Sequence, residues 1–581
     1  MLVFIAILWI AIIAAYRPWQ KNVIVNDVVS YYGYLPAAFI HGDLKLGFTE
    51  NTKEYKYKFW PEKAANGGKV IKTTMGLSIL YAPFFVFGHT AALVSGEAAD
   101  GFSAPYQIAV IAGGLFYLLL GFYYLRKTLL LYFPDKITAF TLLSVFAGTN
   151  LLWYSTMENL MSHQYIFSLL SIFIWHTIRW HKAPTLKTAL YIGLLGGLLT
   201  LIRPTMIFCF LFFALYHVYN LQTLKEKWKL CMSNKVQLLL MAFGVFFVFL
   251  PQLFYWKYVT DQWFFFSYVG ERFYFDHPHL AEGLFGFRKG WLLYTPMMGL
   301  ALAGLFFMRK KAFPLFLPVA LISLLMIYVL LSWWAWWYGG TFGNRAFIDW
   351  YPLLVFPLAG LYNAILERGK TFLKTVLIVC VCAFTALNMF QSWQFSRELI
   401  HYESMTKGAY FEGFFATRKT QKWEELLDEP AYDRARSGLP ESYSEEEIKA
   451  IKPTDVICLK GSNRLIISCE INSTTALSSS KNYIAAWETF LFIRKENNKI
   501  SWKANNKKYV SADLHLLGKL VANRDVAGPW ETFELIYLGN NRIALKADNH
   551  KYVSIDPQEP HMLIAKSDTI TARETFRIYI N

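Results

Sequence analysis

The residues of this 581-residue chain that could do chemistry stand in short polar segments between long apolar runs. Asp27 lies in NDVVSYYGYLP, and Glu158 and His163 lie in MENLMSHQY. A carboxylate can take a proton from a hydroxyl group or bind a divalent cation. Asp27 and Glu158 are therefore our candidate catalytic acids, and His163 is a further site candidate.

Basic side chains accompany these acids in segments of the same kind. Arginine forks and lysine point charges bind phosphate groups, so they suit a substrate that carries a phosphate. Ionisable groups beside a bilayer are costly, which favours a functional role for them. The six cysteines match no zinc motif, and we assign no metal ligand. The candidate phosphate-binding residues are Lys72, Lys69, Arg203, Arg288 and Arg345, and Arg272 and Asp349 are additional site candidates.

The composition places these residues in a membrane protein. Hydrophobic residues make up 55% of the chain and charged residues 17%, whereas soluble domains average about 25% charged residues. The aromatic content of 18% excludes intrinsic disorder. The net charge of +16 sits in short clusters between apolar runs, so it indicates membrane topology and anionic lipid rather than nucleic acid.

Apolar runs follow one another through the first two thirds of the chain. A spanning helix needs about 20 apolar residues. The first run is an anchor rather than a signal peptide, because it lacks a basic leader and a small-residue cleavage site. We predict eleven spans, near 3–16, 106–125, 137–155, 165–180, 187–202, 204–219, 236–255, 292–308, 312–332, 347–365 and 372–390.

The basic clusters of the chain indicate whether one further apolar stretch, residues 73–92, spans the membrane. If this stretch does not span, all of the clusters fall on one side of the membrane, which is then the cytoplasmic side. We therefore predict a membrane-edge helix at 73–92, within one large external loop over residues 17–104. The C-terminus then lies outside. The clusters begin at Arg126, Arg179, Lys225, Arg309 and Arg368.

The polar C-terminal part repeats with a step of 43 residues. WETF begins at Trp487 and Trp530, and RETF begins one step later at Arg573. KYVS begins at Lys508 and again, one step later, at Lys551. Three such units with alternating strands and Asn-rich turns predict a threefold all-β module, whose recurrent aromatic and Val-Ser positions form a shared core.

This module resembles a β-trefoil of the fascin type. The predicted domains are a transmembrane domain at 1–394, a charged connector at 395–455 and the trefoil at 456–581. The fold class that we predict is an α-helical polytopic membrane protein followed by an all-β trefoil domain.

Residues 1–390 resemble the GT-C superfamily of polyprenyl-phosphate-sugar-dependent glycosyltransferases, and the acids and cations named above carry this resemblance. This superfamily includes the protein O-mannosyltransferases, which also carry a trefoil, and the lipid A aminoarabinose transferases. Asp27 matches the acidic residue early in the first external loop, and Glu158 matches an acid of the second. Lys72 best matches the basic residue before a membrane-edge helix, with Lys69 as the alternative. Relatives often have an acidic pair, whereas here Asn26 precedes Asp27.

The resemblance implies transfer of a sugar from a polyprenyl-phosphate donor to a protein, lipid or glycan on the extracytoplasmic side of a bacterial inner membrane. Asp27 would act as the base or orient the acceptor, Glu158 would be the second acid, and the cations would neutralise the donor phosphate. A divalent cation, Mg²⁺ or Mn²⁺, is an open expectation as cofactor. The trefoil would bind glycan, acceptor or a protein partner, and no nucleic acid is expected.

Plain structural roles are the alternatives for these residues. Asp27 could cap a juxtamembrane helix, and Glu158 and His163 could be interfacial residues. Lys69 and Lys72 could extend to lipid headgroups, and Arg203 could bond helix-end carbonyls.

Two other functions compete with the transferase. A non-catalytic translocator of lipid-linked glycans would need charges deep in its spans or paired broken helices, and the sequence shows neither. A membrane-anchored glycan-binding protein would not need eleven spans.

Overall fold

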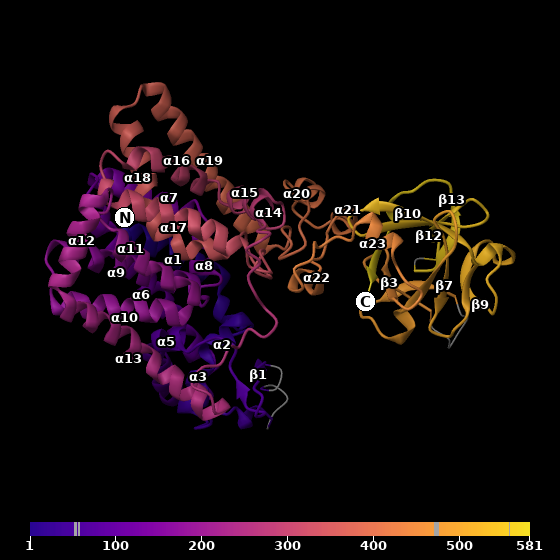
Figure 1. Cartoon of the computed structure of the whole chain (residues 1–581), viewed down its shortest axis with the longest axis horizontal. Coiled ribbons are helices and arrows are strands. Elements are labelled where there is room, and N and C mark those ends of the chain that lie inside the picture. Colours follow the sequence, from indigo (N-terminus) through magenta and orange to yellow (C-terminus); the bar gives the residue numbers. More distant parts are fainter. Residues whose placement is uncertain (51–54, 56–57, 470–475, 557, 560, 581) are drawn as a thin grey trace. The chain divides into compact units, whose positions relative to one another are not determined.

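The computed structural model describes residues 1–50, 55, 58–469, 476–556, 558–559 and 561–580. The chain divides into two compact units, Met1–Tyr410 and Phe411–Asn581. Figure 1 shows helices throughout the first unit and strands in the second. The division falls inside the segment expected to be a connector, and the boundaries at 394 and 455 stay predictions.

The first unit consists almost entirely of helices and their connections. A two-stranded sheet of β1 (Glu62–Lys63) and β2 (Lys69–Val70) accompanies them. The helices of its first half are α1 (Leu2–Tyr16), η1 (Pro18–Lys21), α2 (Asp27–Tyr32), α3 (Tyr34–Phe39), η2 (Gly47–Glu50), α5 (Gly76–Ser95), α6 (Ala104–Leu129), α7 (Asp135–Ala147), α8 (Leu151–Thr156), α9 (Ser162–Lys182) and α10 (Leu186–Ile202). Those of its second half are η3 (Pro204–Phe208), α11 (Cys209–Leu215), α12 (Leu221–Ser233), α13 (Lys235–Thr260), α14 (Leu280–Phe285), α15 (Trp291–Tyr294), α16 (Met297–Met308), α17 (Phe313–Leu331), η4 (Arg345–Trp350), α18 (Tyr351–Arg368) and α19 (Thr371–Ser396).

Six helical segments in the described part of the chain are long and apolar enough to cross a bilayer. They are Leu2–Lys21, α5, α6, α13, α17 and α19. These helices are compatible with a membrane protein, and five of them coincide with predicted spans. The count of eleven spans is not confirmed, because the other predicted spans contain helices that are shorter, interrupted or less apolar.

Helix α5 covers the stretch that the sequence places at the membrane edge. It continues over 20 residues through Pro83 and meets the same criteria of length and apolar character as the other five candidates. A 20-residue helix is about 30 Å long, which equals the thickness of the hydrocarbon core. The length allows a span as well as an edge position, so the edge position stays a prediction.

The predicted span at 137–155 is interrupted between α7 and α8. Asn388 of α19 donates to the backbone carbonyls of Ala147 and Thr149, each at 2.9 Å. The Tyr351 hydroxyl donates to the Asn150 side-chain oxygen at 2.7 Å. A break inside an apolar region is tolerated when other groups satisfy the freed backbone, and Asn388 does so here. Helix α8 then leads directly to Glu158.

Glycines let two pairs of helices approach closely. A Cβ atom at Gly193 of α10 would lie 2.2 Å from the Met241 carbonyl oxygen of α13. A Cβ atom at Gly304 of α16 would lie 2.1 Å from the Pro357 carbonyl oxygen of α18. Small residues at such crossings allow backbones to pack against each other, as in membrane helix pairs generally.

The second unit contains a closed β-barrel with a trefoil-like arrangement. Six strands pair in a ring in the order β3, β6, β7, β10, β11, β14 and back to β3. The other six form the hairpins β4–β5, β8–β9 and β12–β13. The strands are β3 (Val456–Lys460), β4 (Ile466–Ser468), β5 (Ser478–Lys481), β6 (Phe490–Arg494), β7 (Lys499–Ala504), β8 (Tyr509–Asp513), β9 (Lys519–Arg524), β10 (Phe533–Gly539), β11 (Arg542–Lys546), β12 (Tyr552–Ile555), β13 (Leu563–Ser567) and β14 (Phe576–Ile580).

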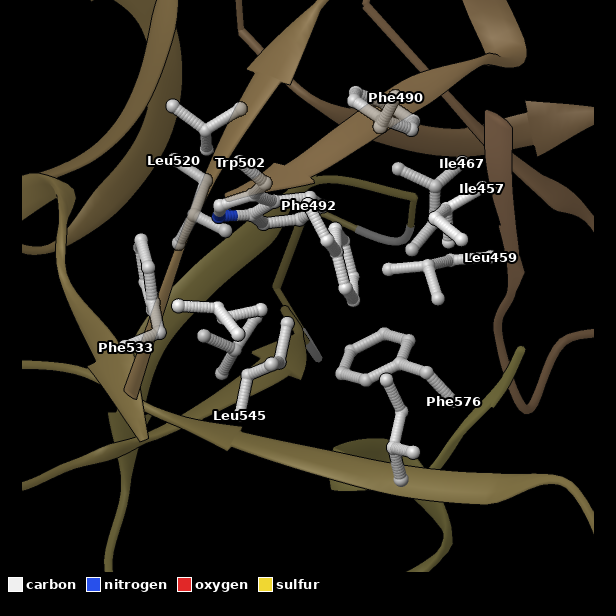
Figure 2. Close-up of a cluster of buried hydrophobic side chains, with 14 of the residues drawn as sticks. Ile457, Leu459, Ile467, Phe490, Phe492, Trp502, Leu520, Phe533, Leu545 and Phe576 are labelled. Atoms are coloured by element: carbon white, nitrogen blue, oxygen red, sulfur yellow. The ribbon is translucent and has the colours of Figure 1, made fainter. Parts of the chain in front are cut away.

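The 43-residue repeat corresponds to four strands per unit. The three repeated phenylalanines, Phe490, Phe533 and Phe576, are all buried in one core, and Figure 2 shows them with Trp502 among its side chains. Val510 of the repeated KYVS motif is buried in the same core. The prediction of a shared core is confirmed for the recurrent phenylalanines and for the valines of KYVS, whereas Trp487 and Trp530 of WETF are half-buried and lie outside this core.

The glutamates of WETF and RETF have a local structural role. Glu488, Glu531 and Glu574 are buried, and each carboxylate accepts a hydrogen bond at 2.8 Å from the backbone N–H three residues earlier. Each closes a short 3₁₀ helix, at η5 (Ala486–Glu488), η7 (Pro529–Glu531) and η8 (Ala572–Glu574). The motif is therefore a turn that positions the following core phenylalanine.

The segment before β3 packs into the barrel. It carries α20 (Lys407–Gly413), α21 (Gln421–Glu425), α22 (Tyr432–Arg436) and α23 (Glu445–Lys449), and α20 straddles the boundary between the units. Tyr443, Ile448 and Ile451 belong to the barrel core. The Glu429 carboxylate accepts hydrogen bonds from Lys460 at 2.8 Å and Arg464 at 2.7 Å. This part of the expected connector is thus structurally joined to the barrel.

Candidate active site

Three predicted site residues meet in one cavity of the helical unit. The cavity has a volume of about 630 Å³, and Asp27, Glu158 and Arg345 all line it. These residues come from three segments that are far apart in the sequence. The end of α1, η1 and the loop after α8 supply further walls, with Tyr402 on another side.

Asp27 is placed by the segment that follows α1. Asn26 adopts a positive φ of 50°, and Asp27 then becomes the first residue of α2. The backbone N–H of Val23 donates to the Gln107 side chain of α6 at 3.0 Å. The Tyr32 hydroxyl donates to the Gly101 carbonyl at 2.5 Å. These bonds hold α2, and hence Asp27, beside the start of α6.

The Asp27 carboxylate forms an ion pair with Arg345. Arg345 Nη2 donates to Asp27 Oδ2 at 2.9 Å, and the side chains are 13% and 39% exposed respectively. Asp27 therefore keeps a free path to the cavity while the guanidinium fixes one oxygen. Its position in the first turn of α2 also suits the partial positive charge of a helix N-terminus, so a helix-end role and a chemical role coincide here.

Glu158 lies just beyond the end of α8. Trp153 Nε1 donates to Glu158 Oε1 at 3.0 Å and fixes the carboxyl group against the cavity wall. Burial raises the pKa of Glu158, and the Trp153 hydrogen bond and the Arg345 charge act in the opposite direction. A carboxyl group with a raised pKa can exchange a proton closer to neutral pH than an ordinary glutamate.

Arg345 follows a glycine-containing loop and begins η4. Gly343 has a φ of 60°, and its Cβ position would lie 3.1 Å from the Tyr294 Cβ atom. The Phe342 N–H donates to the Tyr154 hydroxyl at 2.9 Å. Because Tyr154 belongs to α8, this bond ties the Arg345 loop to the helix that leads to Glu158.

Lys289 supports the same loop, and the sequence analysis did not select it. Its side chain is buried and donates to the backbone carbonyls of Thr341 and Tyr402. Burial lowers the pKa of Lys289 well below its usual range, and the carboxylates of Glu403 and Glu158 oppose this effect. The sequence signal was a lysine directly after the selected Arg288, within a segment rich in glycine and aromatic residues.

A second group of predicted residues meets one turn further along η4. His163 Nδ1 lies 2.8 Å from Asp349 Oδ1, and Arg203 Nη1 lies 3.3 Å from Asp349 Oδ2. Arg203 Nε also donates to the Ser162 hydroxyl at 3.2 Å. Asp349 and His163 are fully buried, so this group has the character of a support that joins α9, α10 and η4. It does not line the cavity of Asp27 and Glu158.

The lysines proposed for the donor phosphate have carboxylate partners. Lys72 Nζ lies 2.6 Å from Glu271 Oε1 and 3.8 Å from Glu62 Oε1. Lys69 Nζ lies 2.5 Å from Glu50 Oε1. The sequence analysis missed these pairings because the partners carry no local signal. Neither lysine lines the cavity, so a phosphate would have to compete with an existing ion pair to bind them.

The two remaining cations contact aromatic rings. The guanidinium of Arg288 lies 5.6 Å from the ring centre of Trp337, and that of Arg272 lies 4.7 Å from the ring centre of Tyr274. Neither residue lines the cavity. Of the ten predicted site residues, Asp27, Glu158 and Arg345 are thus the ones that the cavity brings together.

The donor set of the cavity does not fit a divalent cation held by the protein alone. Its carboxylates are Asp27, which pairs with Arg345, and Glu158. Among the residues that the structure describes, no three His, Cys, Asp or Glu side chains are grouped as metal ligands. We therefore derive no chemical step through Mg²⁺ or Mn²⁺.

The family comparison concerns the C-terminal part of the chain. Residues 470–580 match the FRG1-like domain. No GT-C family model matches the chain, so the resemblance of residues 1–390 to that superfamily stays an expectation. A comparison with curated proteins gives no match.

Three solved structures are similar to parts of this chain, each with a TM-score of 0.20. The designed threefold symmetric protein ThreeFoil is 11% identical, and the match covers 21% of this chain and 96% of ThreeFoil. Cry35Ab1 is 9% identical, with 22% and 36% covered. A Polyporus squamosus lectin bound to a human-type influenza-binding epitope is 10% identical, with 22% and 50% covered. The residues that match the FRG1-like domain lie in the part of the chain that forms the closed β-barrel.

Proposed function

We propose that the helical unit is an integral-membrane glycosyltransferase that moves a sugar from a polyprenyl-phosphate donor to a hydroxyl acceptor. The observation that carries the proposal is the meeting of Asp27, Glu158 and Arg345 in one cavity of a protein with six apolar helices. Two carboxylates and a cation are the groups needed to activate a hydroxyl and to balance a departing phosphate.

In this reaction the acceptor oxygen forms a bond to the anomeric carbon of the sugar. The bond between that carbon and the phosphate oxygen breaks, and polyprenyl phosphate leaves with the electron pair. The acceptor proton passes to the Asp27 carboxylate, whose other oxygen Arg345 holds at 2.9 Å. Arg345, at the same point of the cavity, supplies positive charge for the departing phosphate.

Glu158 serves as the second acid in this proposal. Burial raises its pKa, which favours the protonated form of this acid more than in an ordinary glutamate. In this proposal the cavity faces the extracytoplasmic side of the membrane, and the apolar tail of the donor stays in the bilayer. The barrel unit binds glycan, acceptor or a protein partner outside the membrane.

The test is sugar transfer from a radiolabelled polyprenyl-phosphate sugar in proteoliposomes. Asp27→Asn keeps the size of the side chain but removes its charge, so transfer should fall by about 10²–10⁴-fold, the range for a lost general base. Glu158→Gln should lower transfer in the same way, whereas Lys72→Ala, outside the cavity, should mainly raise KM for the donor. Expression and thermal stability should stay near wild type.

The matched control is Asp276→Asn, because Asp276 is 80% exposed in a loop and its carboxylate pairs with the neighbouring His277. Its transfer should equal that of the wild type. Near-normal transfer by a folded Asp27→Asn protein would contradict the proposal and would leave Asp27 with its helix-end role.

A further inference from the structure

A second cavity of the helical unit has a polar end and an apolar length. It is a groove of about 730 Å³ between α5, α6, α9, α10 and α13. Leu194, Leu198, Phe247 and Pro251 line its apolar part. Phe247 is 55% exposed in the described structure, so the groove lies on an outer face of the helices rather than in their core.

Cations gather at the polar end of this groove. Lys187 and His176 line it, and the charges of Lys127 and Arg179 act on His176 together with that of Lys187. Within the described part of the chain, no ion pair joins Lys127, Arg179 or Lys187 to a carboxylate. The Nδ1 atom of His176 is buried and has no hydrogen-bond partner among the described residues. The end of the groove therefore lacks an anion that would balance its charge.

Aromatic rings frame these cations. Lys127 Nζ lies 4.5 Å from the ring centre of Trp175, and the rings of His176 and Tyr191 are in edge contact with centres 4.9 Å apart. Tyr124 completes this side of the groove. Such amphipathic rings beside lysines are typical of the level of lipid headgroups in membrane proteins.

The groove has the length of one lipid tail. Lys187 and Leu198 lie at its two ends on α10, and eleven helical steps span about 16 Å. The hydrocarbon core of a bilayer is about 30 Å thick, so one leaflet contributes about 15 Å. An acyl chain from one leaflet can thus lie along Leu194, Leu195 and Leu198 while its headgroup stays beside Lys187.

The polar end lies away from the candidate active site. His163, at the start of α9, contacts the Arg203–Asp349 group, whereas His176 lies thirteen residues further along the same helix, or about 20 Å. By the distribution of basic clusters, Lys127, Arg179 and Lys187 are on the side that we assign to the cytoplasm. This groove is therefore a different place from the one proposed for the sugar donor.

We propose that this groove binds one anionic phospholipid of the cytoplasmic leaflet. The headgroup phosphate lies between Lys187 and the His176 side chain, within the field of Lys127 and Arg179, and one acyl chain fills the apolar groove. Basic pockets between membrane helices on the cytoplasmic side bind anionic headgroups for this electrostatic reason. The proposal does not depend on the glycosyltransferase reaction.

The experiment is native mass spectrometry of the full-length protein in detergent, with phosphatidylglycerol and phosphatidylcholine of identical acyl chains. One phosphatidylglycerol should bind per protein, and phosphatidylcholine should bind at least about tenfold more weakly. Lys187→Gln should weaken phosphatidylglycerol binding about fivefold, the effect of one lysine near an anionic headgroup. Lys229→Gln, which removes an exposed lysine outside the groove, should leave it unchanged.

A second variant tests the apolar part of the groove. Leu195→Trp fills the apolar part without a change of charge and should abolish phosphatidylglycerol binding. Because Lys187 is exposed, Lys187→Gln should fold and still tests the site if Leu195→Trp does not fold. Equal binding of both phospholipids, or unchanged binding by Lys187→Gln, would overturn the proposal. Tighter binding of polyprenyl phosphate than of phosphatidylglycerol at this groove would also overturn it. Loss of sugar transfer would not bear on it, because the readout is lipid binding alone.

Discussion

The two units hold carboxylates in opposite ways. In the barrel unit, Glu488, Glu531 and Glu574 each accept a hydrogen bond from a backbone N–H three residues earlier. In the helical unit, Asp27 pairs with Arg345, a residue from a segment far along the chain. The first arrangement is local and repeats three times, whereas the second occurs at one place and depends on the whole helical unit.

This difference separates structural acids from candidate catalytic acids. Each barrel glutamate bonds within its own turn, and none of the three lines a cavity found in the described part of the chain. Asp27 and Glu158 are held by side chains and still line a cavity of about 630 Å³. The barrel glutamates therefore serve turns, whereas Asp27 and Glu158 remain the candidates for chemistry because they line a cavity.

The largest expected effect tests the equivalence of the three repeats. Phe490, Phe533 and Phe576 occupy the same position of the repeat and are at most 1% exposed. Replacement of any one by Ala in residues 411–581 should lower the free energy of unfolding by about 3–5 kcal/mol, the usual cost of deleting a buried ring. Urea denaturation followed by tryptophan fluorescence measures it.

The control for this series is Phe→Leu at the same three positions, which should cost less because it leaves a smaller cavity. The three alanine variants should agree with each other more closely than any of them agrees with its leucine control. A large loss at one position and none at the other two would show that the repeat does not form one shared core.

The sequence predicts the barrel because its signals are local. The 43-residue step and the WETF, RETF and KYVS motifs identify buried positions that the core confirms. The role of Tyr443 and Ile448 in that core could not be predicted, because they lie outside the repeat and within a charged segment. Their burial depends on the folded barrel rather than on a pattern of their own.

The sequence predicts the residue types of the candidate site better than their partners. Asp27, Glu158 and Arg345 were selected as charged residues beside apolar runs, and they line one cavity. The pairing of Lys72 with Glu271 joins two loops and leaves no trace in local spacing. The number of spans could not be predicted from local pattern either, because an apolar helix such as α5 has the same length whether it lies at the edge of a bilayer or crosses it.

An intermediate loss of stability is expected in the helical unit when a long-range side-chain hydrogen bond is removed. Asn388 donates to the carbonyls of Ala147 and Thr149 at the break before α8. Asn388→Ala leaves both carbonyls without this donor and should lower stability by about 1–3 kcal/mol, the cost of an unsatisfied buried polar group. The measurement is unfolding of the full-length protein in detergent mixed with SDS, followed by circular dichroism.

Only the helical transition should move in this variant, because Asn388 lies in the first unit. Thr375→Ala is the control on the same helix, since the Thr375 hydroxyl donates to the carbonyl of Thr371 in its own turn. A shift of the barrel transition by Asn388→Ala, or equal shifts for the two variants, would contradict a long-range role for Asn388.

The smallest expected effect is a pH dependence of the barrel unit at Glu429. Burial tends to raise the pKa of this carboxyl group, but the hydrogen bond and charge of Lys460, with those of Arg464, outweigh it and hold the pKa at about 2. An unfolded glutamate has a pKa of about 4.3. Because the folded pKa is the lower one, the ion pairs contribute fully above about pH 4.3, and their contribution is lost as the pH falls towards 2.

Between about pH 4.5 and 2, the stability of residues 411–581 should therefore fall less steeply in Glu429→Gln than in the wild type. The difference should be smaller than the effect of Asn388→Ala, because Glu429 is 41% exposed and solvent screens its ion pairs. Urea denaturation at a series of pH values measures it, and Glu534→Gln, which alters an exposed glutamate of β10, is the control. Identical slopes for Glu429→Gln and wild type would mean that the Glu429 ion pairs add nothing to the barrel. The segment before β3 would then be held by its other contacts with the barrel, which include the apolar packing of Tyr443, Ile448 and Ile451, the Asp428–Arg577 ion pair and the hydrogen bonds to Asn541.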